Sequence, residues 1–237
     1  MPDRHDNQSD LAGGYRREQQ YWDARGEADY VSLSPFDQER LARWIGWNGS
    51  GRLLDLGGGS GMVSRLLVNI PNTQCVCLDI SYNLVRYSPV PAVQANAFHL
   101  PFADASFDLV VAAAFFHHMP GKEYDLLKEC NRVLMPGGKI VGYDPSGHCI
   151  QNRLFMSGGP FRLNFFSPDE RPIIPEELKA IVSSVLFKDF RWFLFTFRNE
   201  RMTPFEVVQR YVLSPFSHGF LKKYINRWFF WSANKES

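Results

Sequence analysis

Residues 52–61 read Arg52-Leu53-Leu54-Asp55-Leu56-Gly57-Gly58-Gly59-Ser60-Gly61. The first half of this stretch is typical of a buried strand, and a helical pattern from Met62 to Val68 follows the glycines. Glycines between a strand and a helix let the backbone turn tightly and approach a ligand closely. The helix N-terminus adds free N–H groups and the positive end of the helix dipole. The stretch therefore predicts a ligand-binding loop at the start of an α/β unit.

Apolar runs and helical patterns alternate from this loop to about residue 146. Helical periodicity over residues 122–134 ends in the stop-and-turn signal Met135-Pro136-Gly137-Gly138. Further strands are expected at residues 74–78, around Val93, at 107–113 and at 139–144. Strands that alternate with helices in this way predict a doubly wound, mostly parallel sheet.

The spacing of the glycines favours one class of ligand over another. A dinucleotide-binding loop needs G-x-G-x-x-G, and its third glycine position is Met62 in this chain. The observed spacing is Gly57, Gly59 and Gly61, preceded by the acid Asp55. An acid beside the loop would repel a pyrophosphate but suits a ligand with an ammonium group, such as S-adenosylmethionine. A second acid, Asp79, ends the next strand, where a carboxylate can accept hydrogen bonds from ribose hydroxyls.

Four segments in this order resemble the motifs of the class I methyltransferases, over roughly residues 50 to 146. They are Asp55–Gly61, Asp79-Ile80-Ser81, the run from Asn96 to Phe102 with Ser106-Phe107-Asp108, and Arg132–Gly138. The resemblance implies a Rossmann-like α/β fold: a mostly parallel seven-stranded sheet with helices on both faces and a C-terminal antiparallel hairpin. It also implies S-adenosylmethionine as cofactor and S-adenosylhomocysteine as product.

The resemblance assigns roles to residues around the loop. Those assigned to the cofactor are Asp55, Gly57, Gly59, Gly61, Asp79, Ile80, Asn96, Ala97 and Phe115. Asp55 would lie near the ammonium group, Asp79 would hold the ribose diol, and Ile80 would pack on the adenine. Asn96 stands where the family usually has Asp, and Ala97 would offer its backbone N–H to the ring. Two alternatives stay open: Asp55 could cap the turn, and Asn96 could be a loop residue without a ligand contact.

Histidines mark the acceptor side of the predicted site. His117 and His118 follow the fourth strand, and His148 follows the fifth on the same edge of the sheet. Imidazole suits a general base near neutral pH, which methyl transfer needs only if the acceptor must lose a proton. The alternative is that one of the pair packs or caps while the other is solvated. Asp144, which closes the fifth strand, is a further candidate or an organiser of the lid.

The rest of the chain divides into a cap and lid segments. Residues 1–48 are expected to form an N-terminal tail and cap helices, and residues 49–237 the methyltransferase domain, with lid or acceptor insertions at 145–175 and 198–226. The aromatic C-terminal third could line an apolar acceptor pocket or form a core. Residues 220–231 have the pattern of a basic amphipathic helix that could lie on a membrane. The family resemblance favours a last strand from Trp228, paired with residues 190–197.

The composition of the chain argues against several classes of protein. The net charge of +1 gives no bulk excess for a nucleic-acid partner, so none is expected. The polar start lacks the apolar region of a secretory signal, and the four cysteines show no C-x-x-C spacing. We expect reduced thiols, no metal, and a cytoplasmic protein; the sequence does not give the oligomeric state.

The predicted activity is methylation of a small hydrophobic or aromatic acceptor, at oxygen or carbon ahead of nitrogen. The alternatives are an RNA or protein methyltransferase, and a binding protein without turnover.

Overall fold

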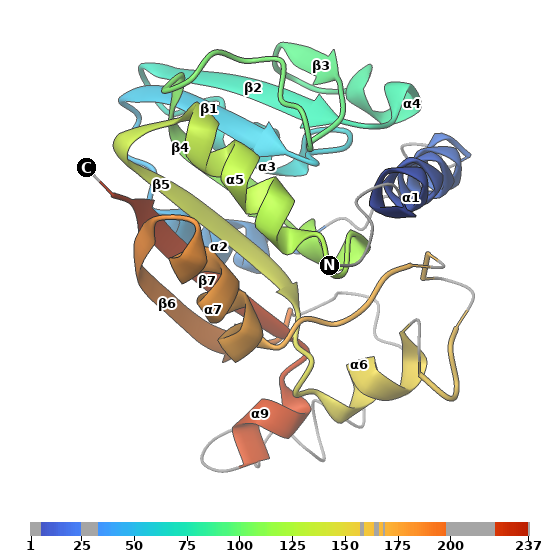
Figure 1. Cartoon of the computed structure of the whole chain (residues 1–237). Coiled ribbons are helices and arrows are strands. Elements are labelled where there is room, and N and C mark those ends of the chain that lie inside the picture. Colours follow the sequence, from blue (N-terminus) through green and yellow to red (C-terminus); the bar gives the residue numbers. More distant parts are fainter. Residues whose placement is uncertain are drawn as a thin grey trace.

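The computed structural model describes residues 6–24, 33–156, 159–163, 166–167, 169–197 and 221–236, with side chains from residue 15 onward. Within these ranges the chain forms one sheet that helices cover on two sides (Figure 1).

Seven strands form this sheet in the order β3-β2-β1-β4-β5-β7-β6. They are β1 (Gly51–Leu56), β2 (Thr73–Asp79), β3 (Ala92–Gln94), β4 (Phe107–Ala113), β5 (Leu134–Pro145), β6 (Phe187–Phe195) and β7 (Trp228–Lys235). The first five strands are parallel, and β7 runs antiparallel to both β5 and β6. The predicted fold class, including its antiparallel C-terminal pair, is confirmed.

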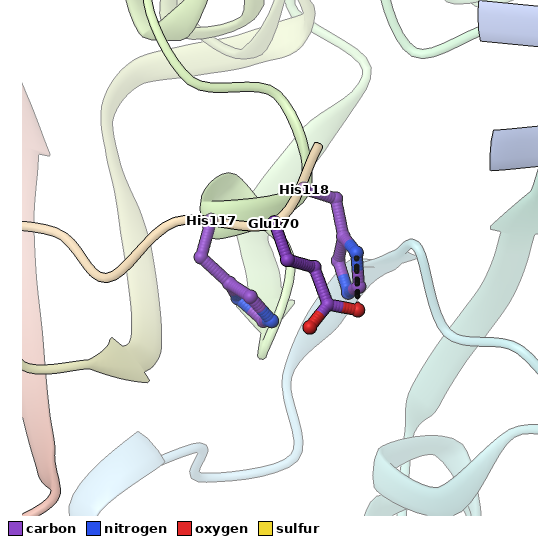
Figure 2. A group of neighbouring side chains, drawn as sticks. All are labelled: His117, His118 and Glu170. Carbon is purple, nitrogen blue, oxygen red and sulfur yellow. Dashed lines mark ion pairs between the residues drawn. The ribbon is translucent and has the colours of Figure 1, made fainter. Parts of the chain in front are cut away.

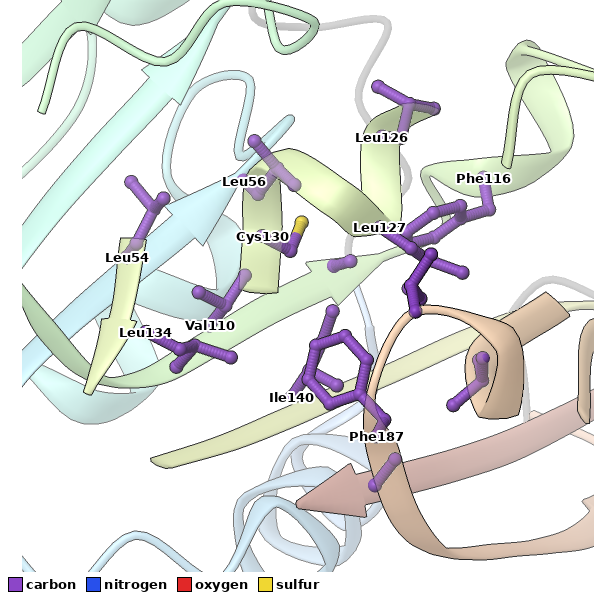
Figure 3. Close-up of a cluster of buried hydrophobic side chains, with 14 of the residues drawn as sticks. Leu54, Leu56, Val110, Phe116, Leu126, Leu127, Cys130, Leu134, Ile140 and Phe187 are labelled. Carbon is purple, nitrogen blue, oxygen red and sulfur yellow. The ribbon is translucent and has the colours of Figure 1, made fainter. Parts of the chain in front are cut away.

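Helices cover both faces of the sheet because successive strand side chains point to opposite sides. Leu54 of β1 packs with α5 (Glu123–Val133) and α7 (Pro175–Ser184) in the cluster that Figure 3 shows. Its neighbour Leu53 packs on the other face with α2 (Pro35–Ile45) and α3 (Met62–Leu67). The short helices α4 (Tyr82–Val85), η2 (Phe116–His118), α6 (Ile150–Phe155) and α9 (Lys222–Ile225) lie in the connections.

Helix α1 (Asp6–Asp23) lies at the carboxyl edge of the sheet rather than on a face (Figure 1). The Ser81 hydroxyl, just past the end of β2, donates to Asp23 Oδ1 at 2.6 Å, and the Asn83 side-chain amide donates to the Asp23 carbonyl at 2.8 Å. Arg17 pairs with Asp169 of the 145–175 segment at 2.9 Å. Of the helices in residues 1–48, α1 therefore lies over the strand ends, whereas α2 packs against the sheet.

The turn expected at residues 135–138 lies inside β5, which begins at Leu134. Phe107 pairs with Leu134 and Leu109 with Lys139, so the register shifts between these two pairs. Gly137 accommodates the bulge with a φ of +74°. The stop-and-turn signal thus marks a bulge between the parallel strands β4 and β5. The chain kinks at this point and then resumes its pairing with β4.

The C-terminal segment resolves the alternative left open by its sequence. Residues 228–235 form β7 at the centre of the antiparallel part of the sheet, so the amphipathic helix over 220–231 is wrong for Trp228 to Trp231. Phe229 and Trp231 are fully buried, so these aromatic side chains are core rather than a membrane-facing surface. Most of the insertion expected at 198–226 lies outside the described residues. Across the part of the chain that is described, no helix has the length and apolar character needed to span a membrane.

Candidate functional site

The glycine loop turns over the end of β2. The backbone N–H groups of Gly57 and Gly58 both donate to the Leu78 carbonyl, at 2.8 and 3.1 Å. Gly57 has a φ of +66°, and a Cβ there would lie 2.2 Å from the Phe115 ring. Glycine is required at this position both by the backbone conformation and by the close approach of Phe115.

Asp79 is joined directly to this loop. Its Oδ2 accepts from the Gly59 N–H at 2.9 Å, and its Oδ1 accepts from the Ser81 N–H at 2.9 Å. Asp79 is only 7% exposed, and this burial raises the pKa of its carboxyl group. Carboxylate oxygens carry two lone pairs each, so both keep capacity for a further donor. The structure thus brings together the loop and the second acid.

Asp55 lies behind the loop, where a Cβ on Gly58 would come within 2.6 Å of its carboxyl carbon. Its Oδ2 accepts from the backbone N–H and the hydroxyl of Ser64, at 3.0 and 2.7 Å, which caps the first turn of α3. Burial raises the pKa of Asp55 to about 6. Its Oδ1 is buried without a hydrogen-bond partner among the described residues. The capping alternative is present, and the contact with an ammonium group stays a prediction.

Residues expected at the adenine lie beyond β2 and β3. Asn96 Oδ1 accepts from the Phe98 N–H at 2.9 Å, which closes a local turn. Ile80 and Ala97 are half-buried, and the Gln94 amide donates to the Ile80 carbonyl at 3.1 Å. The Asn96 side chain therefore has a structural role in its own loop, and its contact with an adenine remains a prediction.

His117 faces the carboxylate of Asp144 at the end of β5. The distance from His117 Nδ1 to Asp144 Oδ1 is 3.0 Å, and the same oxygen accepts from the His117 backbone N–H at 3.2 Å. Trp231 Nε1 donates to the other oxygen, Oδ2, at 3.1 Å. Burial lowers the pKa of His117 to about 3 and raises that of Asp144 to about 7. We assign a neutral imidazole with its proton on Nδ1, because every other partner of Asp144 is a donor.

His118 lies between two carboxylates from distant parts of the chain. Its Nδ1 is 3.4 Å from Glu18 Oε2 on α1 and 3.3 Å from Glu170 Oε1 (Figure 2). Burial alone would lower the pKa of His118, but these two acids outweigh it and raise that pKa. Glu18 also accepts from the Ser167 hydroxyl at 2.5 Å and from Trp22 Nε1 at 3.1 Å. Helix α1, η2 and the 145–175 segment thus meet at one buried polar cluster.

His148 is separate from the histidine pair in its contacts. The His117 and His118 rings lie 4.1 Å apart between centroids, whereas His148 Nε2 pairs with Glu176 Oε2 at 2.7 Å. The Glu176 side chain is 57% exposed, so this ion pair is on the surface.

Sequence reasoning missed Glu18, Ser167 and Glu170. Each is a single polar residue without a motif, and Glu18 and Ser167 are 149 positions apart in the chain. Only the fold brings them to the histidines. A surface hollow lined by Arg52, Thr73, Gln74 and their neighbours lies at the opposite, amino-terminal ends of β1 and β2 and does not join this site.

Comparisons with known proteins show what the residues around the site are similar to. A model described as "Methyltransferase domain" matches residues 54–142, which include the glycine loop, Asp79 and both histidines. The chain is 30% identical over 132 residues to a 27-O-demethylrifamycin SV methyltransferase of Amycolatopsis mediterranei, covering 51% of this chain and 48% of that protein. It is 35% identical over 103 residues to the ubiquinone/menaquinone biosynthesis C-methyltransferase UbiE of Pseudomonas savastanoi pv. phaseolicola, covering 38% and 40%. The chain therefore spans less than half the length of these relatives.

A solved structure shares the fold over most of the chain. The SAM-dependent methyltransferase from Archaeoglobus fulgidus superposes with a TM-score of 0.64 at 20% identity, covering 84% of this chain and 93% of that one. At that identity the likeness concerns the fold alone. Residues 54–142 thus match a methyltransferase domain model, and the chain shares its fold with a SAM-dependent methyltransferase.

Proposed function

We propose that this protein transfers the methyl group of S-adenosylmethionine to a small acceptor. One observation carries the proposal: the Gly59 N–H of the glycine loop donates to the Asp79 carboxylate at 2.9 Å. This bond keeps the glycine loop and the Asp79 carboxylate together at one edge of the parallel sheet. A nucleoside with an amino acid end would need both of them there. The methyltransferase domain model that matches this chain and the names of the relatives also support methyl transfer.

The residues present fit such a cofactor. Gly57, Gly59 and Gly61 all have positive φ angles, which bend the loop into the proposed cradle, and a Cβ at Gly57 would clash with the Phe115 ring that packs on it. Asp55 keeps a buried oxygen without a hydrogen-bond partner among the described residues, which suits an ammonium group. We assign the ribose hydroxyls to Asp79, and the adenine to Ile80, Asn96 and Ala97. When bound, S-adenosylmethionine supplies a sulfonium-linked methyl group, and the protein orients it.

The proposed acceptor is a small, hydrophobic or aromatic molecule methylated at oxygen or carbon. The names of the two relatives are consistent with both atoms. His117 and His118 lie on the acceptor side, at the end of β4 and next to α1 and the 145–175 segment. For a hydroxyl acceptor, a base at His117, His118 or, more weakly, His148 stays a prediction.

Two experiments test the proposal. Mass spectrometry of the purified protein should detect retained S-adenosylmethionine or S-adenosylhomocysteine, and calorimetry should give saturable binding of S-adenosylhomocysteine. Supplying phenolic and quinol acceptors with labelled cofactor should then yield methylated product. Binding without any product would favour the alternative of a binding protein, and methylation confined to RNA or protein would favour a macromolecular enzyme. Absence of cofactor binding would refute the proposal.

We also propose a cytoplasmic location. It is supported by the four cysteines, Cys75, Cys77, Cys130 and Cys149, which are all buried free thiols. A membrane contact through the lysines of α9, the exposed Lys222 and the half-buried Lys223, remains a weaker proposal. Vesicle flotation with anionic lipids would test it, since only a membrane-binding protein would move with the vesicles.

A further inference from the structure

We propose that His117, His118 and Glu170 bind one divalent transition-metal ion. One ligating atom of each of these three side chains lies within 4.8 Å of the others. The two histidines come from η2 and the glutamate from the 145–175 segment, and Figure 2 shows the Glu170 carboxylate paired with the His118 ring, with His117 nearby. His117 and Glu170 are each only 5% exposed, so the group is built into the fold rather than scattered over a surface.

The orientation of His117 is the first observation that supports a metal. Its Nδ1 is engaged with Asp144 at 3.0 Å, which leaves Nε2 as the lone-pair nitrogen of a neutral ring. Histidine ligands in metal sites commonly donate their other ring nitrogen to a carboxylate, which fixes the tautomer and the ring plane. Trp231 in turn holds the second oxygen of Asp144 at 3.1 Å. The support around His117 is therefore the kind that a metal ligand requires.

The distances around His118 are the second observation. Its Nδ1 lies 3.3 Å from Glu170 Oε1, yet this buried nitrogen has no hydrogen-bond partner among the described residues. The separation is therefore an ion-pair contact without hydrogen-bond alignment. Two ligands that each lie about 2.0–2.1 Å from one tetrahedral ion are about 3.3 Å apart. The distance between these two atoms is therefore the one expected for two ligands of a single tetrahedral ion.

Charge supplies the third observation. Glu18, Glu170 and Asp144 are all buried, and within the described part of the chain their ion pairs are only to His117 and His118. A divalent cation would compensate these carboxylates far better than imidazoles do, since buried charge is costly without a partner.

The donor set decides the kind of ion and the open position. Two imidazoles and one carboxylate suit Zn²⁺ and Fe²⁺ rather than Mg²⁺ or Ca²⁺, which prefer oxygen ligands alone. The oxygens of Glu18 already accept from Ser167 and Trp22, so we assign Glu18 to the surroundings of the site. Three protein ligands leave a position for water or for an anionic oxygen of an acceptor. With the ion bound, His117 and His118 would be ligands rather than the base that a hydroxyl acceptor needs. The inference goes beyond the proposed function, because the glycine loop and Asp79 do not need the ion.

The test uses the full chain after chelator treatment, with Co²⁺ and Zn²⁺ as probes. Co²⁺ titration followed by visible absorption, and Zn²⁺ content after equilibrium dialysis, should show one ion per chain. Glu170→Gln and His118→Asn should each weaken binding by more than about tenfold. The matched controls are Glu176→Gln and His148→Asn, which remove the exposed histidine–glutamate pair elsewhere and should bind as the wild type does. Circular dichroism confirms that each variant is folded.

Two results would overturn the proposal. One is wild-type protein that takes up no stoichiometric Co²⁺ or Zn²⁺, which would leave the cluster as hydrogen bonds and ion pairs only. The other is equal affinity in Glu170→Gln and Glu176→Gln, which would place the ion elsewhere. S-adenosylhomocysteine binding measured on the same metal-free protein separates this failure from a failure of the proposed function.

Discussion

The indole nitrogen of Trp231 lies 3.1 Å from Oδ2 of Asp144, so strand β7 holds the carboxylate that His117 faces. Trp231 pairs in register with Gly142 of β5, where a Cβ would lie 2.8 Å from the indole ring. Glycine at 142 therefore makes room for the ring, and the ring positions a donor toward the site. The antiparallel end of the sheet thus contributes to the polar cluster as well as to the core.

Trp231→Phe should destabilise the protein by about 1–3 kcal/mol beyond the loss of packing, because Asp144 Oδ2 would be left buried without its donor. Urea unfolding of the variant and the wild type measures this change. Trp192→Phe is the control, since Trp192 is half-buried on β6 and its indole makes no hydrogen bond recorded among the described residues. Equal losses in the two variants would show that the bond to Asp144 contributes nothing.

Gly57→Ala should abolish or strongly weaken S-adenosylhomocysteine binding. The new Cβ would lie 2.2 Å from the Phe115 ring, so the ring or the loop must move. Gly137→Ala is a matched control, because Gly137 also has a positive φ, +74°, but has open space around the position of a Cβ. Both variants carry the backbone strain of about 1 kcal/mol, and only Gly57→Ala carries the clash. Similar cofactor affinity in the two variants would mean that the loop does not form the proposed cradle.

Asp79→Ala should weaken S-adenosylhomocysteine binding by about 1–3 kcal/mol, because the ribose would lose its acceptor and the Gly59 N–H its partner. Isothermal calorimetry gives the difference directly. Asp104→Ala serves as the control, since the Asp104 side chain is 78% exposed and, among the described residues, pairs only with Arg132. Unchanged affinity in Asp79→Ala would remove Asp79 from the proposed site.

The strands and the loop could be predicted because local pattern determines them. The apolar run ending at Leu56, the glycines and Asp79 encode a parallel strand, a turn and a strand end without reference to the rest of the chain. The pairing of α1 with η2 could not be predicted in this way. Glu18 and His118 are 100 positions apart, and each is one polar residue in an unremarkable context, so no periodicity links them.

Asp144 and Trp231 illustrate the same limit for the site. Asp144 could be recognised as a candidate because it closes a parallel strand. Trp231 could be placed on a strand, but its hydrogen bond depends on the register between β5 and β7, which the sequence pattern does not specify.

Because the carboxyl group of Asp55 is buried, we expect the stability of the folded protein to fall as the pH rises. Burial raises its pKa from 3.8 to about 6 in the folded protein, so between these pH values the native state holds a proton that the unfolded state has lost. The resulting stabilisation is complete below pH 3.8 and is lost as the pH rises through about 6. A pKa difference of this size corresponds to about 3 kcal/mol.

Asp55→Asn removes this dependence, because an amide does not titrate and its oxygen can still accept from Ser64. The free energy of unfolding of the wild type, relative to that of Asp55→Asn, should therefore fall by up to about 3 kcal/mol between about pH 4 and pH 7. Urea titrations across this range measure the difference, in which the other titrating groups cancel. Parallel pH profiles would mean that Asp55 ionises in the folded protein as it does in the unfolded chain, and that its carboxylate is not buried as described.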